Sequence, residues 1–188
     1  MKQHRLMFLK QYLAAPSSIG AVLPSSKHLA EKMTKIINFR NADCIVEYGP
    51  GTGVFTKKIL EKRKKGTILV LFEKNPEFHR ILNEKFPNET DFHVINDSAL
   101  NAGKHLDKLG ISTVGHIVSG LPFASLPVGV SEKILSGTKK ILKPDGRFIT
   151  FQYTMMKKSF IGQYFEKIEI TRELRNFPPA YVFNCSDY

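Results

Sequence analysis

The chain has 188 residues, 42% of them hydrophobic, so it has room for one globular domain with a buried core but not for a second domain of ordinary size. Its 28 Lys and Arg residues against 17 Asp and Glu residues give a net charge of +11, which favours contact with polyanions such as nucleic acid or an acidic lipid surface. Two cysteines without C-x-x-C spacing, and no apolar run near about 20 residues, argue against a disulfide framework, a zinc-cysteine site and a membrane-spanning helix, and they favour a reducing cytoplasm.

The first 13 residues predict a helix with one broad apolar side. On a helical wheel these side chains share an arc: Leu6, Phe8, Leu9, Tyr12 and Leu13. Lys2, Arg5 and Lys10 add positive charge to the same segment. Two readings stay open, because such a helix can lie in a lipid headgroup layer above anionic lipid or simply pack on the domain.

The densest basic run is KKILEKRKK, residues 57–65. It falls on the expected last turns of a helix, where cations complement the negative end of the helix dipole. We therefore interpret it as a solvated helix end.

Short β-branched and aromatic runs alternate with longer stretches of helical period along the rest of the chain. The predicted strands are DCIVEY, TILVLF, DFHVIN, GHIVS and RFITFQY, at residues 43–48, 67–72, 91–96, 115–119 and 147–153. This alternation predicts an α/β fold with right-handed crossovers and a parallel sheet. Residues 163–174 and 180–187 read as two more strands joined by RNFPP, so they predict an antiparallel hairpin at the sheet edge.

A glycine-rich turn, VEYGPGTG, follows the first strand. Gly49, Gly51 and Gly53 let the backbone take positive φ and pass close to a ligand. A dinucleotide fingerprint has the spacing G-x-G-x-x-G, whereas here the spacing is G-x-G-x-G with Glu47 two residues before it. The turn resembles motif I of S-adenosyl-L-methionine-dependent methyltransferases, and the resemblance implies that Glu47 faces the methionine amino end of that cofactor.

Two further acids end the next two strands. Glu73 follows TILVLF, where a carboxylate can accept hydrogen bonds from both ribose hydroxyls. Asp97, with Ser98 beside it, follows the third strand, where the methyltransferase pattern places an acid that accepts from the adenine amine. Each acid alone suits a helix cap or a surface charge, but the carboxyl ends of successive strands are where open α/β sheets bind ligands.

The resemblance implies a Rossmann-like class I methyltransferase: a seven-stranded, mostly parallel sheet with an antiparallel C-terminal hairpin, plus N-terminal helices. It implies a single domain over residues 1–188, with an N-terminal helical lid or membrane-docking segment over 1–40 and a catalytic core over 41–188. The motif SGLPF is similar to the N-L-P-Y of rRNA adenine dimethylases, whose first residue grips the adenine amine. Here that place is read as Ser119 followed by Gly120, so the amide is missing, and no helical RNA-holding domain follows the sheet.

Across nearly its whole length the chain resembles the bacterial phospholipid N-methyltransferases, which are related to the rRNA dimethylases. The segments that carry this likeness are FLKQYLAAPSSIGAVLPSSKHLAEKM, VEYGPGTG, SGLPF and NFPPAYVF. In that family the segment before the first helix closes over the site. The resemblance therefore implies that Ile19, Gly20, Pro24 and Ser25 line the substrate site.

The resemblance implies N-methylation of a phosphatidylethanolamine-type amine at the cytoplasmic membrane face, by a protein peripheral to the membrane. Tyr153 and Phe123 are candidates for the walls of an aromatic amine pocket, with Ser119 beside them, although both rings could equally be core residues. Arg175 is the first candidate for the lipid phosphate and Lys157 the second. The histidines show no ligand spacing, so no metal is expected. The rival readings are an rRNA adenine N6-methyltransferase or other nucleic-acid base methyltransferase, and a protein that binds the cofactor without turnover.

Overall fold

The computed structural model describes residues 25–188. The predictions made for the first 24 residues, which include the amphipathic helix and the lining residues Ile19, Gly20 and Pro24, lie outside the described part of the chain.

A mixed sheet forms the centre of the molecule. Its strands are β1 (Cys44–Tyr48), β2 (Ile68–Phe72), β3 (Phe92–Ile95), β4 (Val114–Ser119), β5 (Leu142–Gln152), β6 (Lys167–Glu173) and β7 (Ala180–Ser186). They lie in the order β3-β2-β1-β4-β5-β7-β6. The pairs from β3 to β5 are parallel, and β7 is antiparallel to both β5 and β6. The predicted Rossmann-like, mostly parallel sheet with a terminal hairpin at its edge is confirmed.

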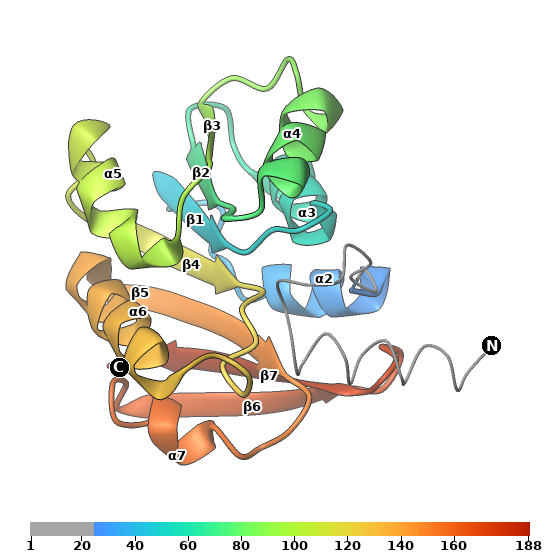
Figure 1. The fold of residues 1–188 in the computed structure, drawn as a ribbon, viewed down its shortest axis with the longest axis vertical. Coiled ribbons are helices and arrows are strands. Elements are labelled where there is room, and N and C mark those ends of the chain that lie inside the picture. The colour runs from blue at the N-terminus through green and yellow to red at the C-terminus, as the bar shows by residue number, and fades with distance from the viewer. Residues whose placement is uncertain (1–24) are drawn as a thin grey trace.

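Helices cover both faces of this sheet, so the fold has three layers (Figure 1). The helices are α2 (Lys27–Thr34), α3 (Val54–Lys62), α4 (Pro76–Lys85), α5 (Ala102–Lys108), α6 (Val128–Ile141) and α7 (Lys158–Ile161), with a short 3₁₀ turn η1 (Ala99–Asn101). Buried side chains of α2, α3 and α4 form one core with the sheet, and those of α5, α6 and α7 form the other. None of the helices in residues 25–188 is both long enough and apolar enough to span a bilayer.

The strand sequences read as continuous apolar runs because both faces of the parallel strands are covered. Along β1, Val46 packs in the core with α5 and α6, while its neighbour Ile45 packs in the core with α2 and α3. Successive side chains point to opposite faces, so Glu47 shares the face of Ile45 and is directed toward α3. The alternation of side chains along β1 thus directs Glu47, the acid that precedes the glycine turn, toward α3.

The fifth strand is longer than predicted. It begins at Leu142 rather than at Arg147, because Leu142 pairs with Val114 before a register shift leads to the pair Arg147 and His116. The KPDG stretch, which comes directly before the predicted strand, lies within this strand. A β-bulge accommodates extra residues in a strand without ending its pairing, and turn-forming residues alone do not reveal that.

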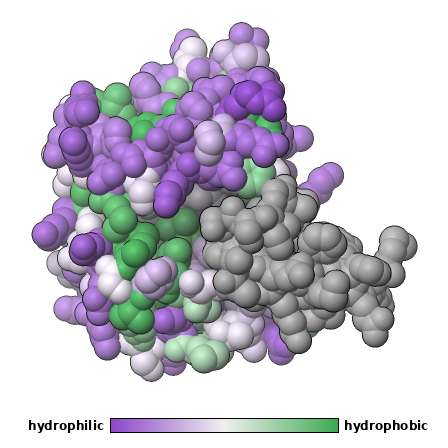
Figure 2. All heavy atoms as spheres, in the orientation of Figure 1, coloured by the Kyte–Doolittle hydropathy of each residue, from purple (hydrophilic) through white to green (hydrophobic). Residues whose placement is uncertain are grey.

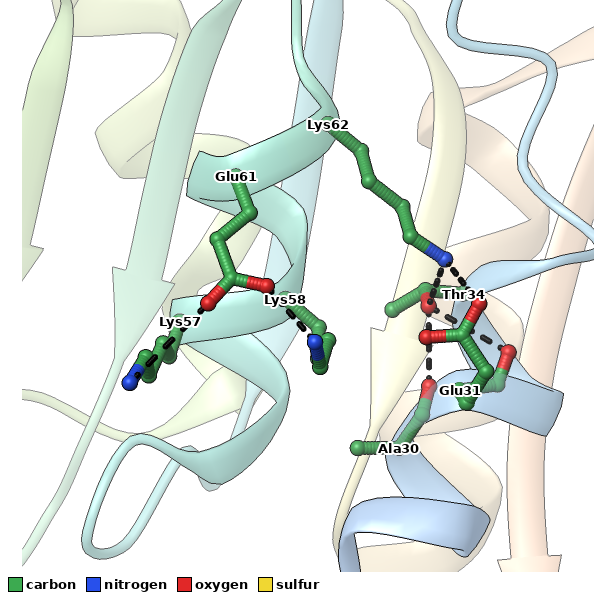
Figure 3. Close-up of polar contacts among 7 residues, drawn as sticks. All are labelled: Ala30, Glu31, Thr34, Lys57, Lys58, Glu61 and Lys62. Carbon is green, nitrogen blue, oxygen red and sulfur yellow. Dashed lines mark hydrogen bonds and ion pairs between the residues drawn. The ribbon is translucent and has the colours of Figure 1, made fainter.

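The first half of the basic run behaves as a solvated helix end. On the surface of α3, Lys57 pairs with Glu61 four residues later, and Lys58 pairs with the same Glu61 three residues later (Figure 3). Exposed pairs of this kind stabilise a helix by about 0.3–0.5 kcal/mol each. This half agrees with the sequence interpretation.

The second half departs from it, because its cations make tertiary contacts. Lys62 reaches from α3 to Glu31 and to the Thr34 hydroxyl of α2, and Thr34 in turn donates to the Ala30 carbonyl (Figure 3). The side chain of Arg63 is only 8% exposed and donates to the carbonyls of three residues of the adjoining loops: Thr67, Thr90 and Asp91. Reading the whole run as solvated was therefore wrong, since sequence alone does not show which lysines and arginines have acceptors nearby.

We expect Arg63→Ala to lower the free energy of unfolding by about 2 kcal/mol, because it removes a nearly buried side chain that donates to three carbonyls, among them the partly buried carbonyl of Thr67. Lys57→Ala is the matched control from the same run, and its effect should stay within about 0.5 kcal/mol. Urea unfolding of both variants measures the difference. Equal effects of the two substitutions would contradict the tertiary role assigned to Arg63.

Candidate active site

The three acids predicted from the sequence lie along one edge of the sheet. The parallel register aligns Tyr48 with Phe72 and Phe72 with Ile95, so β1, β2 and β3 end level with one another. Glu47, Glu73 and Asp97 therefore meet at the carboxyl ends of three neighbouring strands. This is the place where open α/β sheets bind their ligands.

The glycine turn is fixed by a hydrogen bond to the second acid. The Gly51 N–H donates to Glu73 Oε2 at 3.0 Å, and the Asn75 N–H donates to Glu73 Oε1 at 2.8 Å. Gly51 has a φ of 55°, and a side chain there would meet no atom within 4 Å, so the glycine is required by the backbone conformation and not by crowding. The turn thus leaves open space beside a carboxylate that holds its backbone.

Burial raises the pKa of Glu73, and the hydrogen bonds from Asn75 and Gly51 partly oppose this increase. Each carboxylate oxygen still has a lone pair that the backbone does not use. Glu73 can therefore accept from a pair of ligand hydroxyls while it continues to hold the turn.

Glu47 is fully buried and only half satisfied. Thr56 of α3 donates to Glu47 Oε2 at 2.8 Å, whereas Oε1 has no hydrogen-bond partner among the described residues. Burial raises the pKa of Glu47 to about 8; the Thr56 hydroxyl opposes this shift and the charge of Glu73 adds to it. A buried acid with an open oxygen suits a ligand that brings a cationic amino group.

Asp97 is held more tightly than the sequence suggested. Its carboxylate accepts from the Ser98 N–H at 2.6 Å, from the Asn101 amide at 3.0 Å and from His105 at 2.7 Å. The His105 hydrogen bond, followed by those of Ser98 and Asn101, lowers the pKa of Asp97 to about 2. These contacts occupy the acceptor positions of both oxygens, so an adenine amine at Asp97 would have to replace one of the present donors.

Ser119 and Gly120 have roles different from the predicted one. The Ser119 side chain is fully buried, and its hydroxyl accepts from the Leu121 N–H at 3.2 Å, so it does not reach the open side of the strand edge. Counted back from Leu121 and Pro122, the Asn of N-L-P-Y corresponds to Gly120. A Cβ at Gly120 would lie 2.6 Å from the Gly49 carbonyl oxygen, so this backbone has no room for an asparagine.

Of the two predicted aromatic walls, only Tyr153 remains near the edge. It is half buried just after β5 and packs edge-on against Phe151, with ring centroids 5.6 Å apart. Phe123 is fully buried and packs against Phe148 in the core below α5 and α6. The Phe123 ring faces no surface that a substrate can reach, because the turn after β4 folds it under the sheet.

The hairpin turn meets the start of α2. Asn176 accepts from the Ser26 N–H at 2.9 Å and donates to the Pro178 carbonyl at 2.8 Å, and it is almost completely buried. Ser26 also caps α2 by accepting from the Leu29 N–H. The contact brings Ser25, the described member of the predicted lid, next to the NFPPA turn.

The two phosphate candidates are placed at the same edge of the sheet. Arg175 donates through its backbone N–H and through Nε to Glu173, while its side chain is 68% exposed. Lys157 follows β5, and its Nζ lies 4.8 Å from the centroid of the Phe160 ring. Both cations therefore already contact another side chain, Glu173 for Arg175 and Phe160 for Lys157, and both lie beside the strand ends.

Three residues of the site were missed by sequence reasoning: Thr56, His105 and Asn176. Thr56 and Asn176 gave no signal of their own. Thr56 meets Glu47 only because the glycine turn folds α3 back over β1, and the partner of Asn176, Ser26, is 150 residues away in sequence. His105 lies eight residues after Asp97, a spacing that only the η1 turn and the first turns of α5 bring together. Among residues 25–188, no group of three or more His, Cys, Asp or Glu side chains could hold a metal ion.

A family model for ribosomal RNA adenine dimethylases matches residues 20–170. The chain belongs to this family. It is a class I, S-adenosylmethionine-dependent N-methyltransferase.

Two curated relatives place the methyltransferase within the family. It is 30% identical over 181 residues to the ornithine lipid N-methyltransferase of Singulisphaera acidiphila, a match that spans 95% of this chain and 94% of the relative. It is 31% identical over 125 residues to the ribosomal RNA small subunit methyltransferase A of Pelagibacter ubique, covering 66% of this chain but only 43% of that protein. The match thus spans nearly the whole length of the lipid relative and less than half of the ribosomal one.

A solved structure confirms the fold. Precorrin-6y C5,15-methyltransferase from Geobacter metallireducens superposes with a TM-score of 0.67 at 13% identity, over 85% of this chain and 87% of that chain. At this identity the likeness concerns the arrangement of strands and helices alone.

The raised pKa of Glu47 predicts a pH-dependent cost to folding. The folded chain keeps the Glu47 proton up to about pH 8, whereas the unfolded chain loses it near the ordinary value of 4.5. Wild-type stability should therefore fall as pH rises through this window, because the unfolded state releases a proton that the folded state retains.

Glu47→Gln cannot ionise, so we expect its stability relative to wild type to increase from pH 5 to pH 8 and then to level off. Urea unfolding at several pH values measures this difference, with Glu77→Gln on the exposed first turn of α4 as the control for loss of a carboxylate. A constant difference between Glu47→Gln and wild type over the same range would contradict the buried, protonated state.

Proposed function

We propose that this methyltransferase N-methylates the amine of phosphatidylethanolamine-type phospholipids at the cytoplasmic surface of the membrane. The observation that carries the proposal is the full-length match to an ornithine lipid N-methyltransferase, since the chain covers almost all of that relative. Because Gly120 leaves no space for an asparagine that would hold an adenine amine, a lipid amine is favoured over adenine as the methyl acceptor.

The residues at the carboxyl edge fit the cofactor of this class. In the proposal, the unpartnered oxygen of Glu47 meets the amino group of the methionine part, and Glu73 accepts from the ribose hydroxyls. Asp97 and Ser98 lie at the adenine end. The turn that passes beneath the cofactor is formed by Gly49, Gly51 and Gly53, each with positive φ.

S-adenosylmethionine, when bound, supplies an electrophilic methyl group, so the protein needs to position the acceptor and help remove one proton from its nitrogen. A half-buried aromatic wall lowers the pKa of an ammonium by desolvation, which increases the share of amine that can attack. Tyr153 is placed for this role after β5. Its ring also suits the methylated headgroup, which remains cationic.

The lipid phosphate requires a cation near the same edge. Arg175 is the first candidate, because Glu173 fixes its Nε while most of the side chain remains exposed. A guanidinium oriented in this way can present its outer nitrogens to a phosphate in two-point contact. Lys157, over the Phe160 ring, is the second candidate.

Methylation of rRNA adenine is the competing activity. It is favoured by the family model and by the ribosomal relatives, and by the net charge of +11. Two observations argue against this activity. Gly120 stands in place of the amine-binding asparagine, and the match covers less than half of the ribosomal relative.

For the cofactor, Glu73→Ala should weaken S-adenosylmethionine binding at least tenfold, about 1.4 kcal/mol, through loss of charged hydrogen bonds. Titration calorimetry measures the affinity, and thermal melting checks that the fold remains. Glu77→Ala, on the exposed start of α4, is the control and should leave the affinity unchanged. Unchanged binding by Glu73→Ala would place the ribose elsewhere.

For the acceptor, methyl-labelled S-adenosylmethionine can be offered with liposomes containing phosphatidylethanolamine and, separately, with unmodified ribosomal RNA. We expect label in the lipid extract and none in the RNA, because Gly120 removes the adenine grip. Label in the RNA alone would overturn the proposal in favour of the dimethylase activity. Label in neither fraction would also overturn it and point to another acceptor or to binding without turnover.

A further inference from the structure

Exposed large apolar side chains are concentrated at one edge of the molecule. Eight such side chains occur in the described residues, and six of them follow the carboxyl ends of β3, β4, β5 and β6. The six are Leu100 after β3, Val128 after β4, Met155 and Met156 after β5, and Leu174 and Phe177 after β6. We call this set the apolar edge.

Strand direction explains why these loops share an edge. The strands from β3 to β5 are parallel, and β6 runs in the same direction because both β5 and β6 are antiparallel to β7. Gln152 at the end of β5 pairs with Tyr181, and Glu173 at the end of β6 pairs with the adjacent Ala180. The four loops therefore leave the sheet on the side that carries the glycine turn and the three acids.

Two stretches that follow the strand ends contain no charged residue. Residues 98–103 and 119–131 lack Asp, Glu, Lys and Arg altogether, in a chain in which 24% of residues are charged. The η1 turn of the first stretch lies against α6, which begins in the second. Figure 2 shows hydrophobic surface gathered over η1 and the start of α6, whereas the half of the molecule around α3 and α4 is mostly hydrophilic.

The extent of exposure excludes ordinary packing as the reason for these side chains. Met156 is 84% exposed and Leu174 65%, both on loops, and Val128, the first residue of α6, is 55% exposed. A monomer rarely gathers such side chains around one site unless a partner covers them.

Positive charges lie among the apolar residues. Lys74, Lys157, Lys158 and Arg175 sit on the loops after β2, β5 and β6. Of the acids at this edge, Glu73 and Glu173 are buried and Asp97 already holds several donors, whereas Glu77 at the start of α4 is exposed. The surface therefore combines exposed apolar side chains with a net positive charge.

We propose that the apolar edge lies on the surface of a bilayer that contains anionic lipid, with Met155, Met156, Leu174 and Phe177 in the headgroup layer and Lys157 and Arg175 at lipid phosphates. This inference rests on the proposed lipid function, and it adds that docking is made by the sheet edge itself and not solely by the N-terminal segment. Flexible apolar side chains on separate loops, interspersed with cations, suit shallow insertion into anionic lipid. Docking in this orientation brings the strand ends to the depth of the headgroup amines.

The test uses the full chain and vesicles of phosphatidylglycerol and phosphatidylcholine, without amine lipid and without cofactor, so that docking is measured apart from methyl transfer. We expect Met155→Ser with Met156→Ser, and separately Leu174→Ser, to weaken sedimentation with the vesicles at least fivefold at low salt. The controls are Leu109→Ser and Tyr188→Ser, because these exposed apolar residues follow α5 and β7 at the opposite edge. Their vesicle binding should stay within twofold of wild type, and all variants should melt at the wild-type temperature.

Vesicle binding that is equal in the edge variants and the controls overturns the docking inference, as does wild-type protein that ignores anionic vesicles at low salt. Loss of RNA binding in the edge variants, with vesicle binding unchanged, overturns it in favour of a nucleic-acid surface. The proposed function fails separately: edge-dependent docking without label in phosphatidylethanolamine refutes the acceptor and leaves the docking surface standing. Label in phosphatidylethanolamine, together with docking that does not depend on the edge residues, supports the acceptor and refutes the docking surface.

Discussion

The close approach of two backbones at the ends of β1 and β4 is the constraint on which the site depends. The Gly120 N–H donates to the Tyr48 carbonyl at 2.8 Å, and a Cβ at Gly120 would come within 2.6 Å of the Gly49 carbonyl oxygen. A side chain at Gly120 would separate the loops and move the glycine turn away from Glu73. The same glycine that allows this contact leaves no room for an asparagine, so in the proposed function packing and acceptor choice are linked at one position.

The acids of the candidate site and the exposed apolar side chains lie at the same edge because the strand ends supply both. A parallel sheet gathers its carboxyl-end loops on one side, where the inner loop positions provide Glu47 and Glu73 and the outer positions provide Met156 and Leu174. A membrane lipid presents its amine only at the bilayer surface. An enzyme acting on it gains from having its reactive groups and its apolar contacts side by side, since orientation on the bilayer then also positions the substrate.

The C-terminal hairpin contributes to the site although it lies beyond the parallel strands. Its turn holds the start of α2 through Asn176 and Ser26, and Lys32 of α2 pairs with Glu173 at 3.3 Å. Backbone polar groups at a buried chain junction need partners, and the hairpin supplies them. The segment that leads into α2 therefore enters the fold at a position fixed by residues about 150 positions later in the chain.

The sequence by itself determined the fold class, the order of strands and helices, the hairpin, the glycine turn and the acids at the strand ends, because periodicity, turn chemistry and strand polarity are local properties. It did not reveal the partners of those acids: Gly51 meets Glu73 through the crossover from β1 to β2, Thr56 meets Glu47 through the glycine turn, and His105 meets Asp97 through the η1 turn. It also misplaced Phe123 and Ser119, since whether a residue at a strand end faces the core or the ligand depends on how the next loop folds back. Tertiary structure decided which lysines and arginines are engaged and which apolar residues share an edge, because those properties depend on distances between segments far apart in the chain.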